Sequence, residues 1–217
     1  MPKVKVCGIT RVEDARFLAS LEVDYIGVVA YPKSPRFVPS HEREELLGAC
    51  GKVRKVAVVV NPTLDEVEEL LHQGFDLIQL HGEEEVTLAE AIGMDRVIKA
   101  FRVGEEKPRI DERWKEAHAI LLDTYSKEAY GGTGRTFDWS LAREIIESGF
   151  RVMLAGGLTP LNVGEAVRRL RLYGVDVSSG VEIRPGVKDR EKVLKFLKEV
   201  KGGESGLRYH SGKAQRR

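Results

Sequence analysis

The stretch Val4-Lys5-Val6-Cys7-Gly8-Ile9-Thr10 contains the pattern that decides the fold. A short apolar run opens the chain and ends in a thiol, and a glycine that suits a tight turn follows at once. Thr10 and Glu13 are then three residues apart, which is the spacing of a capping box at the start of a helix. The stretch predicts a strand, a turn and a helix, with Cys7 at the carboxyl end of the strand.

The same strand–helix pattern recurs almost to the end of the chain, because apolar β-rich runs alternate with amphipathic segments. The predicted strands are Lys3–Cys7, Tyr25–Ala30, Lys55–Val60, Leu77–His81, Val97–Phe101, Ala119–Asp123, Arg151–Ala155 and Val175–Ser178. Eight strand–helix units in about 200 residues are the number that closes a parallel barrel. We therefore expect the α/β class and a single (β/α)8 TIM barrel. An open doubly wound sheet is the alternative, although no Gly-x-Gly-x-x-Gly follows the first predicted strand.

Several predicted helices begin with a residue that can cap the amino-terminal turn. The predicted capping residues are Thr63 (with Glu66 in a capping box), Asp138, Thr159 (before Pro160) and Asp189. In the last predicted helix one apolar stripe is formed by Val193, Phe196, Leu197 and Val200. No linker divides the chain, so we expect one domain over residues 1–200. Residues 201–217 are expected to be a polar, basic tail that is disordered or peripheral.

The composition excludes several classes of function. Lys and Arg number 35 against 34 Asp and Glu, which argues against a nucleic-acid binder that works by neutralising phosphates. Two cysteines, Cys7 and Cys50, are too few for a disulfide framework. The amino terminus lacks the apolar segment of a signal peptide, and no apolar run is long enough to span a membrane. We expect a cytoplasmic protein without a nucleic-acid or membrane partner.

Two candidate catalytic residues end predicted strands, where the active site of such a barrel is built. Cys7 ends the first strand and Asp123 ends the sixth, and one base with one acid suits a proton-transfer isomerisation without a cofactor. Lys5 lies on the same strand face as Cys7, so its ammonium would favour the thiolate. Structural alternatives remain: Cys7 as a small buried apolar residue, Asp123 as a helix cap or loop ion pair, and Lys5 paired with Asp176 inside the barrel.

A phosphate site is predicted after the seventh and eighth strands. Gly156 and Gly157 allow backbone amides to approach a ligand, and a helix expected to begin near Pro160 would direct its positive end toward them. Ser179 and Gly180 offer further amides after the eighth strand. Barrel enzymes often bind phosphate in these two loops. The alternative is that these glycines only form tight turns that need a positive φ.

Three other features are candidates for substrate contact. Arg36 can grip a carboxylate with two parallel hydrogen bonds. His81 shares a strand face with Gln79 and can donate to a substrate, tune a neighbour or be purely structural. The glycine-rich loop Tyr130–Arg135 suits a lid or a plain connector. No cluster of His, Cys and acidic residues has the spacing of metal ligands.

Taken together, these motifs resemble the phosphoribosylanthranilate isomerase family of tryptophan biosynthesis. The first matching segments are Lys5-Val6-Cys7-Gly8-Ile9-Thr10, Tyr31-Pro32-Lys33-Ser34 with Arg36, Gln79-Leu80-His81-Gly82-Glu83 and Leu121-Leu122-Asp123-Thr124. The later ones are Gly131-Gly132-Thr133-Gly134 with Phe137-Asp138-Trp139, Leu154-Ala155-Gly156-Gly157-Leu158, Asn162-Val163, Gly174 through Glu182, and Pro185-Gly186 with Lys188-Asp189. They occur in the family order and cover residues 3–200.

The resemblance implies an Amadori rearrangement of N-(5'-phosphoribosyl)anthranilate to 1-(2-carboxyphenylamino)-1-deoxyribulose 5-phosphate, without a cofactor. By the same resemblance, Asp123 is the general acid and Cys7 is the general base. The residues at matching substrate positions are Arg36 for the anthranilate carboxylate, Gly156, Gly157, Ser179 and Gly180 for the phosphate, and His81 and Asp176 in supporting places. The substrate is a small phosphoribosyl molecule, and the expected assembly is a monomer or homodimer.

Two rival functions remain open from the sequence. A sister barrel isomerase of histidine synthesis, acting on an aminoimidazole ribonucleotide, or an enzyme that accepts both substrates, would share the mechanism. Those enzymes resemble this chain but carry an aspartate where Cys7 stands, so the cysteine favours the anthranilate enzyme. A non-catalytic phosphosugar-binding barrel would keep the phosphate loops and lose Cys7 or Asp123, and both residues are present.

Overall fold

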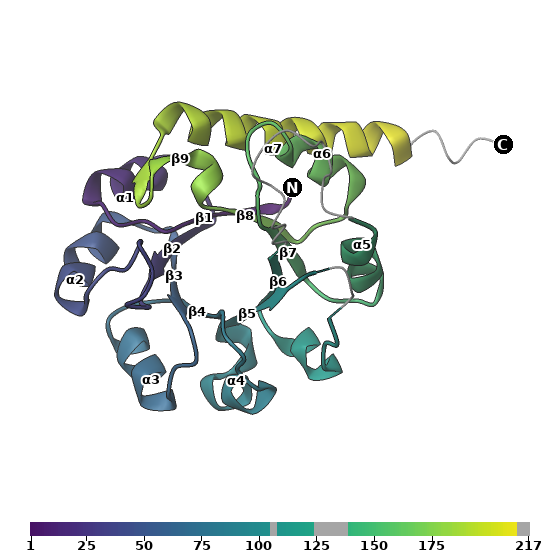
Figure 1. The fold of residues 1–217 in the computed structure, drawn as a ribbon. Coiled ribbons are helices and arrows are strands. Elements are labelled where there is room, and N and C mark those ends of the chain that lie inside the picture. The colour runs from purple at the N-terminus through teal and green to yellow at the C-terminus, as the bar shows by residue number, and fades with distance from the viewer. Residues whose placement is uncertain (105–107, 124–138, 212–217) are drawn as a thin grey trace.

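A closed barrel of eight parallel strands forms the centre of the molecule (Figure 1). The computed structural model describes residues 1–104, 108–123 and 139–211, with side chains as far as residue 202. The barrel strands are β1 (Lys3–Cys7), β2 (Tyr25–Val29), β3 (Arg54–Val59), β4 (Leu77–Leu80), β5 (Val97–Arg102), β6 (Ala119–Asp123), β7 (Val152–Ala155) and β8 (Gly174–Val177). Each strand pairs with the next, and β8 closes onto β1. The predicted TIM barrel is confirmed, and each predicted strand agrees to within one residue at either end.

Helices surround the barrel on its outer side (Figure 1). They are α1 (Val12–Ala19), α2 (Ser40–Ala49), α3 (Leu64–His72), α4 (Val86–Ile92), α5 (Trp139–Glu147), α6 (Val163–Arg169) and α7 (Arg190–Ser211). Shorter elements are the 3₁₀ segments η1 (Met94–Arg96), η2 (Glu112–Glu116) and η3 (Ser179–Val181), and the hairpin strands β9 (Glu182–Arg184) and β10 (Val187–Lys188). In the described part of the chain, no helix combines the length and the apolar character that crossing a bilayer requires.

The two faces of each barrel strand belong to different layers, because side chains alternate along a strand. On β1, Val4 and Val6 point outward into the large apolar cluster shared with the helices. Lys5 and Cys7 alternate with them and belong to the inside of the barrel. Burial on both faces explains why the strands read as nearly continuous apolar runs in the sequence.

Two of the predicted helix caps are confirmed. Thr63 and Glu66 form the reciprocal capping box at the start of α3. The Asp189 carboxylate accepts hydrogen bonds from the backbone N–H groups of Glu191 and Lys192 at the start of α7. The apolar stripe of α7 is also buried as expected. Asp138, predicted to cap α5, lies outside the described residues.

Two other predicted caps are wrong. The α1 helix begins after Arg11 without a side-chain cap, and the Thr10 hydroxyl instead donates to the Gly186 carbonyl at 2.7 Å. The Thr159 hydroxyl accepts from the Leu161 N–H within a turn, so α6 begins at Val163 and not near Pro160. In both cases the hydroxyl makes a competing bond that spacing along the sequence does not reveal.

Helix α7 continues past residue 200, the expected end of the barrel, as far as Ser211 (Figure 1). It packs on α6, which lies beside it on the outside of the barrel. The first part of the expected tail therefore continues a helix, whereas residues 212–217 lie outside the described residues. The peripheral position of residues 201–217 stays a prediction.

Candidate active site

A cavity of about 650 Å³ opens at the carboxyl ends of the barrel strands. It is lined by Cys7, Val29, Tyr31, Ser34, Arg36, Val58, Val60, Gln79, His81, Asp123, Ala155, Gly156, Gly157, Leu158, Asp176, Val177, Ser178, Ser179 and Gly180. All of the site residues predicted from the sequence are in this set. The parallel register explains the gathering, because every strand delivers its carboxyl end to the same rim.

Cys7 lies beside a buried ion pair. The Lys5 ammonium is fully buried and is 3.1 Å from Asp176 Oδ1, its register partner on β8, and its charge also acts on the Cys7 thiol. Burial raises the pKa of the Cys7 thiol above its ordinary value; Lys5 opposes this effect and the Asp176 carboxylate adds to it. Lys5 therefore favours the thiolate, as expected, but burial has the larger effect on the pKa of Cys7. Burial prevails, and Asp176 already balances much of the charge of Lys5.

A glycine in β2 makes room for this arrangement. Gly27 is the register partner of Cys7, and a Cβ atom there would lie 2.8 Å from Cys7 Sγ and 3.0 Å from Lys5 Nζ. Both distances are shorter than side chains normally tolerate. The sequence analysis missed Gly27, because nothing along the chain indicates that a thiol and an ammonium approach it.

Asp123 contacts a histidine that is itself held by an amide. His81 Nε2 is 3.3 Å from Asp123 Oδ2, and His81 Nδ1 is 2.9 Å from Gln79 Nε2. Gln79 is 1% exposed, whereas His81 and Asp123 are partly open to the cavity. The structure thus joins the candidate acid on β6 to Gln79, which lies within β4, and to His81, which directly follows that strand.

Arg36 is already engaged by a buried carboxylate of the same chain. Its Nε and Nη2 atoms donate to the two oxygens of Glu182, at 2.9 and 2.6 Å. The buried Lys188 ammonium donates to the same carboxylate at 2.7 Å and to the Cys7 carbonyl at 2.5 Å. Burial would raise the pKa of Glu182, but the hydrogen bonds from Arg36 and Lys188 lower it below its ordinary value.

Glu182 and Lys188 are site-supporting residues that the sequence analysis did not assign. They come from the small β9–β10 hairpin after η3, where Lys188 pairs in register with Glu182. Their proximity to Arg36, far away in the sequence, depends on closing β8 onto β1. The only available signal was that both residues occur in segments quoted for the family resemblance.

The two predicted phosphate loops lie against each other. Gly156 and Gly157 have positive φ values of 79° and 63°, so they do form the tight turn of the structural alternative. A Cβ atom on Gly157 would meet open space, whereas one on Gly180 would lie 1.9 Å from the Leu158 carbonyl oxygen. The loop after β7 therefore packs directly on the η3 turn after β8, and both line the cavity. The short α6 helix starts too late for the contribution expected from Pro160.

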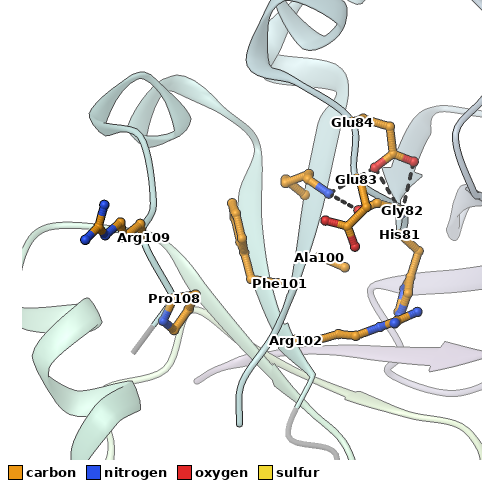
Figure 2. A pocket seen from close by; sticks show the side chains of 10 residues that line it. His81, Gly82, Glu83, Glu84, Ala100, Phe101, Arg102, Pro108 and Arg109 are labelled. Atoms are coloured by element: carbon orange, nitrogen blue, oxygen red, sulfur yellow. Dashed lines mark hydrogen bonds and ion pairs between the residues drawn. The ribbon is translucent and has the colours of Figure 1, made fainter. Parts of the chain in front are cut away.

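A smaller hollow of about 300 Å³ adjoins the cavity at His81 (Figure 2). The buried Lys99 ammonium donates to the Gly82 carbonyl at 2.7 Å and to Glu84 at 2.9 Å, which holds the loop that carries His81. In Figure 2 the Arg102 side chain points toward His81. Among the residues that the structure describes, no three His, Cys, Asp or Glu side chains are grouped so that they could hold a metal ion.

The fold and the site define a class of protein: a (β/α)8-barrel enzyme with a thiol, a carboxylic acid and two glycine-rich turns around one cavity. A family model described as N-(5'-phosphoribosyl)anthranilate (PRA) isomerase matches residues 4–199. This chain therefore belongs to the N-(5'-phosphoribosyl)anthranilate isomerase family.

Relatives of known name agree with this membership. A curated N-(5'-phosphoribosyl)anthranilate isomerase from Aquifex aeolicus is 55% identical over 203 residues, which cover 93% of this chain and 99% of that protein. The crystal structure of phosphoribosyl anthranilate isomerase from Thermotoga maritima superposes with a TM-score of 0.81 at 38% identity, covering 93% of this chain and 100% of that one. A family structure in complex with reduced 1-(o-carboxyphenylamino)-1-deoxyribulose 5-phosphate has a TM-score of 0.79 at 34% identity, with coverage of 93% and 100%.

Proposed function

We propose that this chain is an N-(5'-phosphoribosyl)anthranilate isomerase of tryptophan biosynthesis. It converts its substrate to 1-(2-carboxyphenylamino)-1-deoxyribulose 5-phosphate in the cytoplasm, by acid–base catalysis without a cofactor. The observation that carries the proposal is that Cys7 and Asp123, from strands far apart in the sequence, line one cavity in a member of this family. The anionic ends of the substrate match the cationic and amide-rich parts of the same cavity.

The phosphate is proposed to bind at the adjoining turns after β7 and β8. Gly156, Gly157, Ser179 and Gly180 supply backbone amides there, and the open space at Gly157 admits a ligand next to the chain. The anthranilate carboxylate is proposed to bind Arg36 through its Nη1 side, since Nε and Nη2 donate to Glu182. Holding both ends orients the ribose between acid and base, which lowers the barrier by removing motional freedom before the reaction.

The proposed chemistry begins at Asp123. Its carboxylic acid protonates the ring oxygen of the ribose, so that the C1–O bond breaks and a Schiff base forms between C1 and the anthranilate nitrogen. Cys7 then removes the proton from C2, and the electron pair of that C–H bond neutralises the iminium to give an enolamine. Tautomerisation of the enolamine produces the 2-keto product. Each positioned acid or base of this type contributes about 10²–10⁴ in rate.

Lys5 and Asp176 are proposed to support the base. Burial raises the pKa of the thiol, so the thiolate requires a partner that stabilises its negative charge. The Lys5 ammonium supplies that stabilisation, because its positive charge lowers the pKa of the thiol. Asp176 helps to keep Lys5 charged, since its carboxylate opposes the lowering effect of burial on the pKa of Lys5.

Replacing Asp123 by Asn tests the acid directly. We expect turnover to fall by at least about 10² while product binding, measured by calorimetry, is retained, because the amide keeps the shape and cannot donate the acid proton. Asp65→Asn, at an exposed position on α3, is the matched control and should behave as wild type. Near-normal turnover of Asp123→Asn would refute the assignment of the acid.

Substrate range and assembly need their own measurements. Assays with the anthranilate substrate and with the aminoimidazole ribonucleotide of histidine synthesis should show turnover of the former only, and robust turnover of the latter would contradict the proposed specificity. Growth without tryptophan of a strain that lacks this isomerase should be restored by the chain.

A related Thermotoga maritima enzyme is described as dimeric. We propose a monomer or homodimer here, to be distinguished by sedimentation.

A further inference from the structure

The contacts of Gln79 and Asp123 with His81 indicate which nitrogen of the His81 ring carries a proton. The Gln79 Nε2 atom is an amide nitrogen and can only donate, so the His81 Nδ1 atom 2.9 Å away accepts and carries no proton. The single proton of the neutral ring is then on Nε2, the ring atom that faces Asp123 Oδ2 at 3.3 Å. The amide therefore selects one of the two tautomers of the imidazole.

We propose that Gln79 is a positioning residue, which fixes the tautomer of His81 and thereby directs the acidic proton of Asp123 to its Oδ1 oxygen. Because Oδ2 faces the ring N–H at 3.3 Å, a protonated carboxyl group carries its hydrogen on Oδ1 and offers it to the substrate. The opposite tautomer would present the lone pair of Nε2 to Asp123 and draw that hydrogen toward the ring. This inference rests on the proposed function, in which Asp123 is the general acid.

The burial of Gln79 indicates that the amide is not there for stability. Gln79 is 1% exposed, and its Oε1 atom is buried without a hydrogen-bond partner in the described part of the chain. A buried acceptor without a partner destabilises the folded state, and an apolar side chain of similar size would not carry that penalty. Residues that break such a local rule are expected at functional sites.

The surrounding residues keep the His81 ring next to its two partners, Gln79 and Asp123. The loop after β4 is fixed by Lys99, which bonds to Gly82 and Glu84. The charged groups that face His81 are Asp123 from β6, at 3.3 Å, and Arg102 from β5, which points toward it in Figure 2. In the described structure Gln79 is the residue that contacts Nδ1.

The test compares Gln79→Met with Gln79→Glu in the full chain. Methionine has a similar size and removes the donor, whereas glutamate places an acceptor opposite Nδ1 and moves the ring proton there. The nitrogen shifts of the His81 ring, read by ¹⁵N NMR and assigned with His81→Gln, should show the Nε2–H tautomer in wild type only. We expect both variants to lose at least about tenfold in kcat, a part of the general-acid contribution, with KM within about twofold.

Stability separates this role from a structural one. Gln79→Met should melt at the same temperature as wild type or higher, since it removes the unpartnered Oε1, while its kcat falls. His41→Gln, on the exposed start of α2, is the control and should change neither quantity. An Nδ1–H ring in the wild-type protein, or a Gln79→Met variant with unchanged kcat and tautomer, would overturn the inference. Retained activity of Asp123→Asn would instead refute the acid assignment and leave the NMR result standing.

Discussion

The two ends of the barrel interior are built from the same strands and differ in almost every physical property. At the carboxyl end, charged and polar side chains surround a cavity of about 650 Å³. At the amino end and in the middle, the interior is filled by an apolar layer. This layer contains Tyr25, Val56, Leu77, Ile98, Ala100, Ala119, Leu121 and Met153, and it reaches the cavity wall at Ala155. One end is open for chemistry, and the other is packed.

The polar groups at the two ends also differ in whether they have hydrogen-bond partners. At the amino end, the Tyr25 hydroxyl is 2.9 Å from His118 Nε2 and 3.1 Å from the Tyr173 hydroxyl, so the three side chains satisfy one another. At the carboxyl end, the Cys7 thiol is buried and the Gln79 Oε1 atom has no partner among the described residues. The difference indicates that the arrangement at the amino end favours the stability of the fold. The carboxyl end is less favourable for stability, because its groups serve the reaction.

The largest effect is expected for the base at the carboxyl end. Cys7→Ser should lower kcat by at least about 10² with little change in KM, because an alcohol is a far poorer base than a thiol. In the wild-type protein the rate should increase as the pH rises from neutral, since burial raises the pKa of Cys7 and the base form becomes populated only on the alkaline side. Steady-state kinetics against pH check both statements.

The second cysteine is the matched control for Cys7. Cys50 is also buried, but its Sγ donates to the carbonyl of Leu46 in α2, and Cys50 does not line the cavity. Cys50→Ser should therefore leave kcat and its pH profile as in wild type. If both variants behaved alike, Cys7 would have no special part in the reaction.

The second largest effect is expected in the apolar layer, on stability. Met153→Ala removes a fully buried side chain and should lower the free energy of unfolding by about 2–5 kcal/mol. Well below its melting temperature this variant should turn over normally. Leu161→Ala, at a position that is 86% exposed, is the control and should stay within about 0.5 kcal/mol. Loss of kcat in a folded Met153→Ala protein would break the division between the two ends.

Removing the guanidinium of Arg36 should affect binding more than turnover. A hydrogen bond to a charged group contributes about 1.5–3 kcal/mol, so Arg36→Ala should raise KM by roughly tenfold to a hundredfold. Glu182→Gln keeps the shape of the partner of Arg36 and should raise KM by less. Dissociation constants for substrate analogues with and without the carboxylate should differ in wild type and converge in Arg36→Ala; an unchanged KM would contradict the contact.

The smallest effect is the pH dependence of stability at the amino end. Burial, with the nearby Arg54 and Arg151, lowers the pKa of His118 below its ordinary value of 6.5. As the pH falls below 6.5, the unfolded chain gains a proton at His118 before the folded protein does, so stability should decrease. The loss is complete once the pH has fallen through the lower pKa of the folded state.

Thermal melts of His118→Gln test this linkage. Its melting temperature should fall less between pH 7.5 and 5.5 (about one unit on either side of an ordinary histidine pKa) than that of wild type. His41→Gln, whose side chain is 80% exposed, should follow the wild-type curve. Identical slopes for all three proteins would show that the Tyr25–His118–Tyr173 group does not sense pH.

The comparison also shows which features of the structure local sequence patterns can predict. The strands, the capping box at Thr63 and the apolar stripe of α7 were predictable, because each depends on residues close together in the sequence. The cap predicted at Thr10 failed because its hydroxyl bonds to Gly186, at the other end of the chain. The prediction that Lys5 favours the thiolate was right in direction, but the pKa of Cys7 is raised on balance because burial has the larger effect, and burial depends on how completely the barrel excludes water.

The sequence by itself determined the barrel, the strand ends that carry Cys7 and Asp123, and the glycines after the last two strands, because periodicity and turn chemistry are local. Only the tertiary structure decided that Glu182 bonds to both Arg36 and Lys188, that Gln79 lies against His81 Nδ1, and that burial raises the pKa of the Cys7 thiol. Those properties arise from distances between strands and from burial, and both exist only after the barrel has closed.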